Sequence, residues 1–211
     1  YIIDAKDKGI SVTELVTVDK TRPSIELNLD KVVAELLPGS EKNQEVINKV
    51  LDAGRLMLSA DSVGAAQIML DKAVAYSLER KQFGRVIGSF QAVKHMCAEM
   101  AAELEPCHSM TWYAAHCYDH DPAQARLMAC HTKAHVSEVG KQISKTSTEV
   151  HGGMGFTDEL GLHYWFKRIG LNRQLLGSPE LVREEAARIQ NFDQSPAEGQ
   201  GNKEVGNPLL V

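Results

Sequence analysis

The sequence predicts a mainly α-helical fold, an antiparallel bundle of long helices preceded by the last few strands of a β-domain. Three features of the 211 residues support this fold class. Apolar residues recur every three or four positions along most of the chain, short runs of alternating polarity are confined to residues 1–40, and Pro38-Gly39-Ser40 separates the two patterns. Helices of about 30 residues are about 45 Å long, so in a chain of this size they pack side by side.

Residues 1–40 contain the predicted strands, at 1–4, 10–18 and 24–29. In the last of these, Ile25, Leu27 and Leu29 alternate with polar residues, as in a half-buried strand. Two or three strands do not form a stable sheet alone, because both edges stay uncovered. We therefore expect this segment to be the C-terminal remnant of a larger β-domain. The first residue, Tyr1 rather than Met, fits a chain whose natural start was removed.

Residues 41–190 form the predicted helical bundle domain. Helices are expected at 45–80, 90–118, 121–150, 160–173 and 178–190, and a glycine-closed loop spans 81–88. Two of these helices carry the same start signal, a capping residue followed by Pro at the first helical position: Asp121-Pro122 and Ser178-Pro179. The polar segment 191–211, which contains Gly and Pro, is expected to be a flexible tail.

The composition argues against several classes of protein. A net charge of −5 disfavours sequence-independent nucleic-acid binding, which needs a basic face. The chain contains no run of about 18 apolar residues, so no membrane span is expected. The four cysteines form no CxxC pair and all lie in helical patterns. We therefore expect buried thiols in a reducing cytoplasm rather than a disulfide framework.

Three local patterns suggest chemistry, and each also has a plainer interpretation. His131 and His135 share a helix face, but no third metal ligand is evident, so no metal site is expected. The glycines of segment 152–155 are similar to a dinucleotide-binding loop, yet they follow a helix where that motif requires a strand, and a helix stop explains them. Arg80 and Arg85 flank the 81–88 loop and suit a phosphate, or they belong to a solvated basic loop.

Four segments, taken together, occur in an order and spacing that resemble the C-terminal half of the acyl-CoA dehydrogenase family. They are Leu-Asp-Ala-Gly-Arg at 51–55, Leu-Glu-Arg-Lys-Gln-Phe-Gly at 78–84, Ile-Gly-Ser-Phe-Gln at 87–91 and His-Gly-Gly-Met-Gly-Phe at 151–156. The resemblance covers about residues 1–190, and four motifs in order are far more specific than any one of them alone.

The resemblance implies a flavoprotein oxidoreductase. Members have an N-terminal helical domain, a middle β-domain and a C-terminal four-helix bundle. They oxidise the Cα–Cβ bond of an acyl-CoA substrate, as in the degradation of fatty acids or steroid side chains, and pass electrons from FAD to an electron-transfer flavoprotein. They assemble as tetramers, so a homo-oligomer or a complex with a paralogous acyl-CoA dehydrogenase subunit is expected here.

The resemblance also assigns binding residues. The FAD contacts that it implies are the pyrophosphate-binding Arg80, the flavin-loop residues Gln82, Phe83 and Gln91, the adenosine-end residues Glu149, Gly152 and Gly153, and Ser178 at a helix N-terminus. The acyl-CoA contacts are Asp52, Arg55 and Gly177. Glu149 departs from the Gln usual in the family. A carboxylate there accepts a hydrogen bond from a ribose hydroxyl but repels a phosphate.

The position of the catalytic base is the larger departure from the family. In most members, the Glu that removes the α-proton precedes a Gly-Thr pair late in the chain, where Leu176 stands here. In other members it lies one residue before the arginine of the first motif, where Gly54 stands here. Neither residue can accept a proton, so no catalytic residue is assigned.

Three explanations for the missing base stay open. The chain belongs to the non-catalytic subunit of a heteromeric enzyme; or it belongs to an active homomeric enzyme with its base elsewhere, in an earlier half or at Asp158 or Glu159; or it is an assembly module without flavin. The plainer interpretation of Asp158 and Glu159 is that they are charges capping the next helix. We expect the chain alone to be inactive and to bind FAD weakly, because the family's contacts to the flavin ring come largely from earlier parts of the β-domain.

Overall fold

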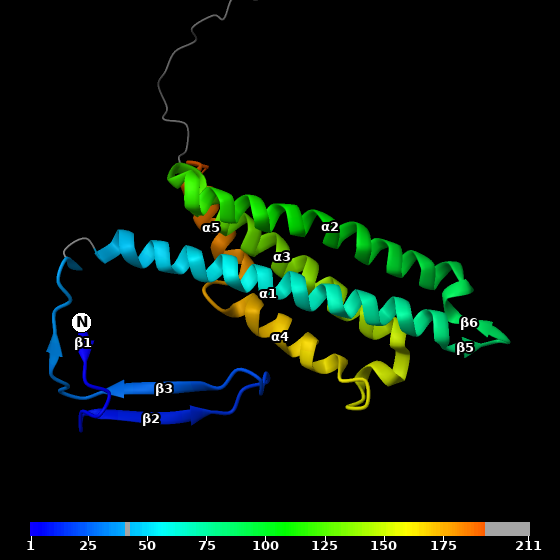
Figure 1. Cartoon of the computed structure of the whole chain (residues 1–211), viewed down its shortest axis with the longest axis horizontal. Helices are drawn as coiled ribbons and strands as arrows, with labels where there is room; N and C mark the ends of the chain where they lie inside the picture. Colours follow the sequence, from blue (N-terminus) through cyan, green and yellow to red (C-terminus); the bar gives the residue numbers. More distant parts are fainter. Residues whose placement is uncertain (41–42, 193–211) are drawn as a thin grey trace, which may run out of the picture.

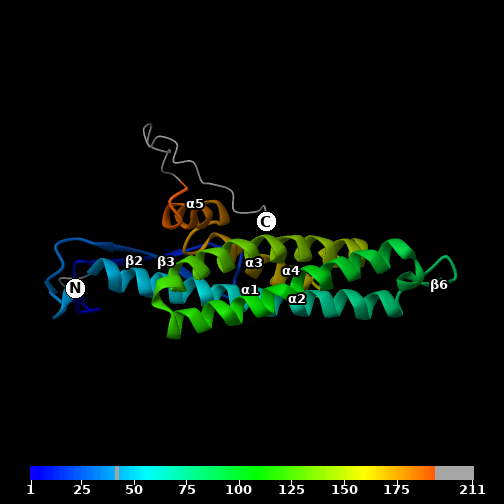
Figure 2. The ribbon, with the colours of Figure 1, turned by 90° about the horizontal axis from the view of Figure 1, so that it is seen from above.

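The computed structural model of the protein describes residues 1–40 and 43–192 and confirms the mainly α-helical class. Three long helices run alongside one another in alternating directions: α1 (Asn43–Glu79), α2 (Gln91–His120) and α3 (Pro122–His151) (Figure 1). Two shorter helices complete the bundle. Helix α4 (Leu162–Gln174) packs against α1 and α3, and α5 (Pro179–Ile189) packs mainly against α3, on the side shown in Figure 2.

The hydrophobic core lies where α1, α2, α3 and α4 face one another. Each helix contributes side chains that are at most 2% exposed, among them Met69, Leu104, Ile143 and Ile169. Removal of this apolar surface from water is the main stabilising contribution to such a bundle. The cysteines are free thiols, and three of them, Cys107, Cys117 and Cys130, are buried, as the helical patterns predicted.

The first forty residues form short antiparallel pairs. Strand β1 (Ile2–Ile3) pairs with β4 (Ala34–Glu35), and β2 (Ile10–Leu15) pairs with β3 (Ser24–Leu29). Strand β4 was not predicted, because two residues are too short for an alternating pattern. Val12 lies opposite Leu27 in the β2–β3 hairpin, and both side chains are at least half exposed. The hairpin therefore presents apolar side chains that the described residues do not cover.

A cluster of polar groups around the buried Asp19 and Asn172, here called the Asp19 cluster, holds the β2–β3 connection against the bundle. Asp19 is 2% exposed and accepts a hydrogen bond from Arg168 Nε of α4 at 2.7 Å. Asn172 accepts from Arg22 Nη1 at 2.8 Å and donates to Asp61 Oδ2 of α1 at 2.6 Å. Because residues 17–21 are used in this cluster, the predicted strand 10–18 ends at Leu15.

Hydrogen bonding in this cluster lowers the pKa of Asp19. Burial alone raises the pKa of the carboxyl group, but hydrogen bonds from Thr21 and Arg168 more than offset this and hold it below its ordinary value. The carboxylate form is therefore the one that stabilises the contact between the β-segment and the helices.

The ends of the helices largely follow the predicted signals. Helix α3 stops at Gly152, whose φ of 57° breaks the helical conformation, and Ser178 Oγ accepts from the backbone N–H of Leu181 at the start of α5. The prediction for Asp121 is only half right. It occupies the N-cap position of α3, but its backbone carbonyl, not its side chain, accepts the bonds of the first turn.

The segment predicted as a loop at 81–88 has regular structure. Strands β5 (Lys81–Gln82) and β6 (Arg85–Val86) form a hairpin, and the short helix η2 (Ile87–Ser89) follows it. After α3, the short helix η3 (Gly152–Phe156) leads toward α4. The expected tail lies outside the described residues from position 193 onward. Within the described ranges, no helix combines the length and the apolar character that crossing a membrane requires.

Candidate functional site

The turn between α4 and α5, residues 175–178, brings together positions 54 and 176, at which the family resemblance places the catalytic base. Leu176 has a φ of 57° and Gly177 a φ of 108°, so the backbone reverses sharply here. The Leu176 side chain lies on α1 at Gly54, where an added Cβ would stand 2.4 Å from Leu176 Cδ1. The two positions, 122 residues apart in the sequence, are therefore in direct contact, and the leucine fills the space that the glycine leaves.

Arg55 fixes this turn from α1. Arg55 is 6% exposed, and its Nε donates to the Leu176 carbonyl oxygen at 3.0 Å. Its other nitrogens contact Glu185 Oε2 at 2.8 Å, Asp52 Oδ1 at 3.4 Å and Cys130 Sγ at 3.3 Å. All of these partners are protein groups, so Arg55 ties α1, α3, α5 and the turn together.

The two carboxylates beside the turn are both paired with arginines. Burial raises the pKa of Asp52, and the charges of Arg126 and Arg55 oppose this shift. For Glu185 the balance is reversed: burial raises its pKa, but hydrogen bonds and charge from Arg55 and Arg126 hold it below its ordinary value. Glu185, in α5 beside this turn, is therefore an ion-pair partner and is poorly suited to take a proton.

Sequence reasoning missed three members of this site: Arg126, Lys133 and Glu185. Lys133 is 1% exposed and lies on the face of α3 that also buries Ala129, Cys130 and Val136. A charged residue inside an otherwise apolar helix face was the available signal for Lys133, and Glu185 beside Val182 and Ala186 carries the same signal.

A second group of predicted residues converges at the opposite end of the bundle, where α3 ends (Figure 1). Arg80, Gln82, Glu149, Gly152 and Gly153 all line one surface cavity of 430 Å³. No atom lies within 4 Å of the place where a Cβ on either glycine would stand, so a ligand can approach their backbone closely. A guanidinium beside an open glycine backbone suits the pyrophosphate of a dinucleotide.

The remaining predicted residues do not all join this cavity. Phe83, at the tip of the β5–β6 hairpin, is 91% exposed, and Gln91 is an exposed residue at the start of α2. Ser178 lies at the other end of the bundle, where it caps α5 beside the Leu176 turn. In one chain, Ser178 and Arg80 therefore cannot touch the same part of a ligand (Figure 1).

Asp158 and Glu159 also lie away from the Leu176 turn. They precede α4, and Leu176 follows it, so the 13 residues of α4, about 20 Å of helix, separate them. The expectation that they cap this helix is wrong. Helix α4 begins later, with Gly161 at its N-cap and no acidic residue in its first turn. Asp158 instead contacts His163 Nε2 at 3.3 Å.

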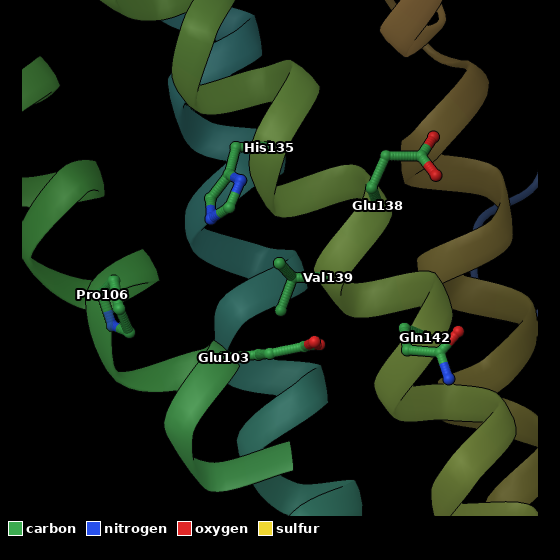
Figure 3. Close-up of a pocket in the computed structure, with 6 residues that line it drawn as sticks. All are labelled: Glu103, Pro106, His135, Glu138, Val139 and Gln142. Carbon is green, nitrogen blue, oxygen red and sulfur yellow. The ribbon is translucent and has the colours of Figure 1, made fainter. Parts of the chain in front are cut away.

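Two other hollows differ in character. A cavity of 500 Å³ opens beside the residues around the Leu176 turn and is lined by Lys49, Asp52, Tyr118 and Arg126, among others. A hollow of 440 Å³ lies between α2 and α3, where the Glu103 side chain extends toward the part of α3 that carries Val139 and Gln142 (Figure 3). Within residues 1–40 and 43–192, no three metal-ligating side chains gather closely enough to hold an ion.

Comparison with known proteins identifies relatives of the helical region. The family described as "Acyl-CoA dehydrogenase, C-terminal domain" matches residues 44–190. A curated relative from Acetobacterium woodii, the caffeyl-CoA reductase-Etf complex subunit CarC, is 32% identical over 168 residues, which make up 75% of this chain and 43% of CarC. The acyl-CoA dehydrogenase IpdE2 of Mycolicibacterium smegmatis is 30% identical over 169 residues, 80% of this chain and 51% of IpdE2.

The solved structures agree with this fold. The structure described as the Tcur3481-Tcur3483 steroid ACAD, in a variant form, superposes with a TM-score of 0.81 at 26% identity, over 90% of this chain and 51% of that chain. The chain spans about half the length of the curated relatives that it matches.

Proposed function

Because the chain belongs to the acyl-CoA dehydrogenase family, through its C-terminal domain, we propose that it is the C-terminal half of an FAD-dependent acyl-CoA dehydrogenase subunit whose base is supplied by a paralogous partner. The contact between Leu176 and Gly54 carries this proposal. The two family positions for the base lie together, and together they offer only a leucine and a glycine. A hydrocarbon side chain at that place cannot take a proton from substrate.

The proposed reaction removes a proton from Cα and a hydride from Cβ of an acyl-CoA thioester. FAD, when bound, accepts the hydride. In this chain, Leu176 places apolar surface where a base would stand, and Arg55 holds the backbone that carries it. Asp52 and Glu185 are engaged by arginines, so they orient the turn and do not act as bases.

The Arg80 cavity is the part of the chain that we assign to the pyrophosphate and adenosine end of FAD. The residues present fit this group: a guanidinium for the phosphates, open glycine backbone, and the Glu149 carboxylate to accept from a ribose hydroxyl. Ser178 caps α5, which lies away from the β5–β6 end of the bundle (Figure 1), so it would contact a different FAD molecule. This arrangement favours an oligomer in which each FAD is shared between two subunits.

The partners that we propose follow from the same reasoning. A paralogous acyl-CoA dehydrogenase subunit would supply the carboxylate, and the two protein names in the related Tcur3481-Tcur3483 structure are consistent with such a pair. Electron-transfer flavoprotein is the proposed acceptor of electrons, since the relative CarC is named as part of a complex with Etf.

Anaerobic flavin absorbance tests the proposal. The subunit that carries this chain is purified with FAD, and acyl-CoA thioesters from butyryl-CoA to a steroid side-chain CoA are added. The measurement is made first without and then with a paralogous acyl-CoA dehydrogenase subunit from the same genome. We expect bleaching of the flavin only with the partner. Bleaching by the subunit alone would place the base in the rest of its own chain, and a subunit without flavin would indicate an assembly module.

A paired variant tests the assignment of the FAD end. Arg80→Ala should reduce the FAD content of the purified complex, because it removes the guanidinium from the cavity. Arg85→Ala is the matched control, since this guanidinium is engaged 4.0 Å above the Phe90 ring and is not among the cavity's lining residues. Equal FAD content in both variants would contradict the assignment.

A further inference from the structure

The buried lysine on α3 has a specific set of partners at the end of α4. Lys133 Nζ donates to the carbonyl oxygens of Asn172 at 2.8 Å and Arg173 at 3.1 Å, and to Ser137 Oγ at 3.2 Å. An ammonium group has three N–H donors, so all three are used. The two carbonyls belong to the last turn of α4, where carbonyl oxygens have no N–H donor within the helix to bind. A cation there also interacts favourably with the helix dipole.

The turn at residues 175–178, which follows the end of α4, has a backbone conformation that its surroundings must stabilise. Leu176 has a positive φ, a conformation that is unfavourable for a non-glycine residue and persists only where the surroundings impose it. Two buried cations act on this turn from different helices. Lys133 fixes the end of α4 just before it, and Arg55 holds the Leu176 carbonyl itself.

We propose that Lys133 is a positioning residue, which holds the end of α4 so that the side chain at position 176 lies over Gly54. This inference rests on the proposed function for its purpose, because position 176 faces the reacting part of the substrate only if the site is an acyl-CoA site. Its geometry is independent of that function. Lys133 does not touch the turn residues themselves; it acts through the α4 carbonyls.

The charges around Lys133 explain why its hold depends on protonation. Arg55 of α1 and Arg173 of α4 are the nearby cations, and they are paired with Glu185 of α5 and Glu138 of α3. Burial, together with these two arginines, lowers the pKa of Lys133 to about 8. The ammonium form, which supplies all three donors, therefore gives way to the amine just above neutral pH.

Methyl NMR tests the proposal without any flavin or substrate. In protein labelled at leucine methyl groups, the wild type should show a strong nuclear Overhauser effect between Leu176 and the Gly54 α-protons. Lys133→Met should weaken it several-fold, while the contacts of Leu104 in the core are kept. Lys145→Met, at an exposed position on the same helix, should leave it unchanged. Full intensity in Lys133→Met, or no such signal in the wild type, would overturn the proposal.

A titration of the wild type keeps the test valid if Lys133→Met does not fold. The Leu176 methyl shift should change with a midpoint near pH 8, and a shift that stays constant through this range would contradict the role of Lys133. Because the sample contains no acyl-CoA, these outcomes concern the positioning role alone. The proposed function fails separately, if the wild-type subunit reduces its flavin without a partner.

Discussion

Gly54 and Leu176 approach each other closely. We therefore predict that Gly54→Ala destabilises the wild type but stabilises a protein in which Leu176 is replaced by alanine. In Gly54→Ala, the new Cβ would lie 2.4 Å from Leu176 Cδ1, far inside the van der Waals distance. Leu176 is 39% exposed and can move, but its carbonyl is held by Arg55. The side chain must therefore leave its place on α1 or strain the turn.

Two opposing contributions determine the magnitude. Alanine in place of glycine inside a helix stabilises by about 1 kcal/mol. Overpacking of the kind seen here costs about 2 kcal/mol. Gly54→Ala should therefore lower the free energy of unfolding by about 1 kcal/mol in the wild type. In a Leu176→Ala background the obstructing methyl group is gone, and the same substitution should raise it by about 1 kcal/mol.

Urea unfolding of the four proteins in this cycle measures the effect. Gly64→Ala is the control, because this glycine lies in the same helix with no atom within 4 Å of its added Cβ. It should stabilise both backgrounds equally. If Gly54→Ala stabilises the wild type as much as the Leu176→Ala protein, the two positions are not in contact, and the reasoning about the site is wrong.

Three further predictions concern stability. The folded pKa of Lys133, about 8, lies below its unfolded value, so the unfolded chain binds more protons above pH 8. Unfolding free energy should therefore rise between about pH 8 and 10.5 by about 3 kcal/mol relative to Lys133→Met, and parallel pH profiles for the two proteins would refute this. Asp19→Ala should cost about 2 kcal/mol at neutral pH, because it leaves Arg168 without its nearest carboxylate partner. Since the pKa of Asp19 is lowered in the fold, the wild type should lose this advantage as pH falls below about 4, and an advantage that persists in acid would contradict the assignment. Ser178→Ala should cost about 0.5–1 kcal/mol through loss of the α5 cap, and an unfolding free energy equal to that of the wild type in the same urea assay would refute this.

The sequence was sufficient for features that depend on local signals. Apolar periodicity and start signals located the five α-helices of the described residues, and glycine at position 152 and the Ser-Pro pair at 178–179 marked helix ends correctly. It failed where structure depends on very short or distant pairings. The two-residue strands β5 and β6 carry no alternation, and the positive φ of Leu176 has no local signature.

The candidate site shows the same division. Motif resemblance named five residues that do line one cavity, and it named the two base positions without indicating that they touch. The ion pairs of Arg55 with Glu185, 130 residues away, and the bonds of Lys133 to the end of α4 arise only from tertiary packing. A buried charge in an apolar helix face signals that a partner exists, but it does not identify the partner.

Restoring a carboxylate at the Leu176 turn is the most direct test of the central claim, that this is an acyl-CoA site without its own base. Leu176→Glu is prepared in the flavin-loaded subunit without its partner, and exchange of the substrate α-proton is followed in deuterated water by NMR. We expect exchange in the variant and none in the wild type or in Leu176→Gln, which is similar in size but not basic. Exchange in the wild type alone, or equal exchange in all three proteins, would contradict the claim.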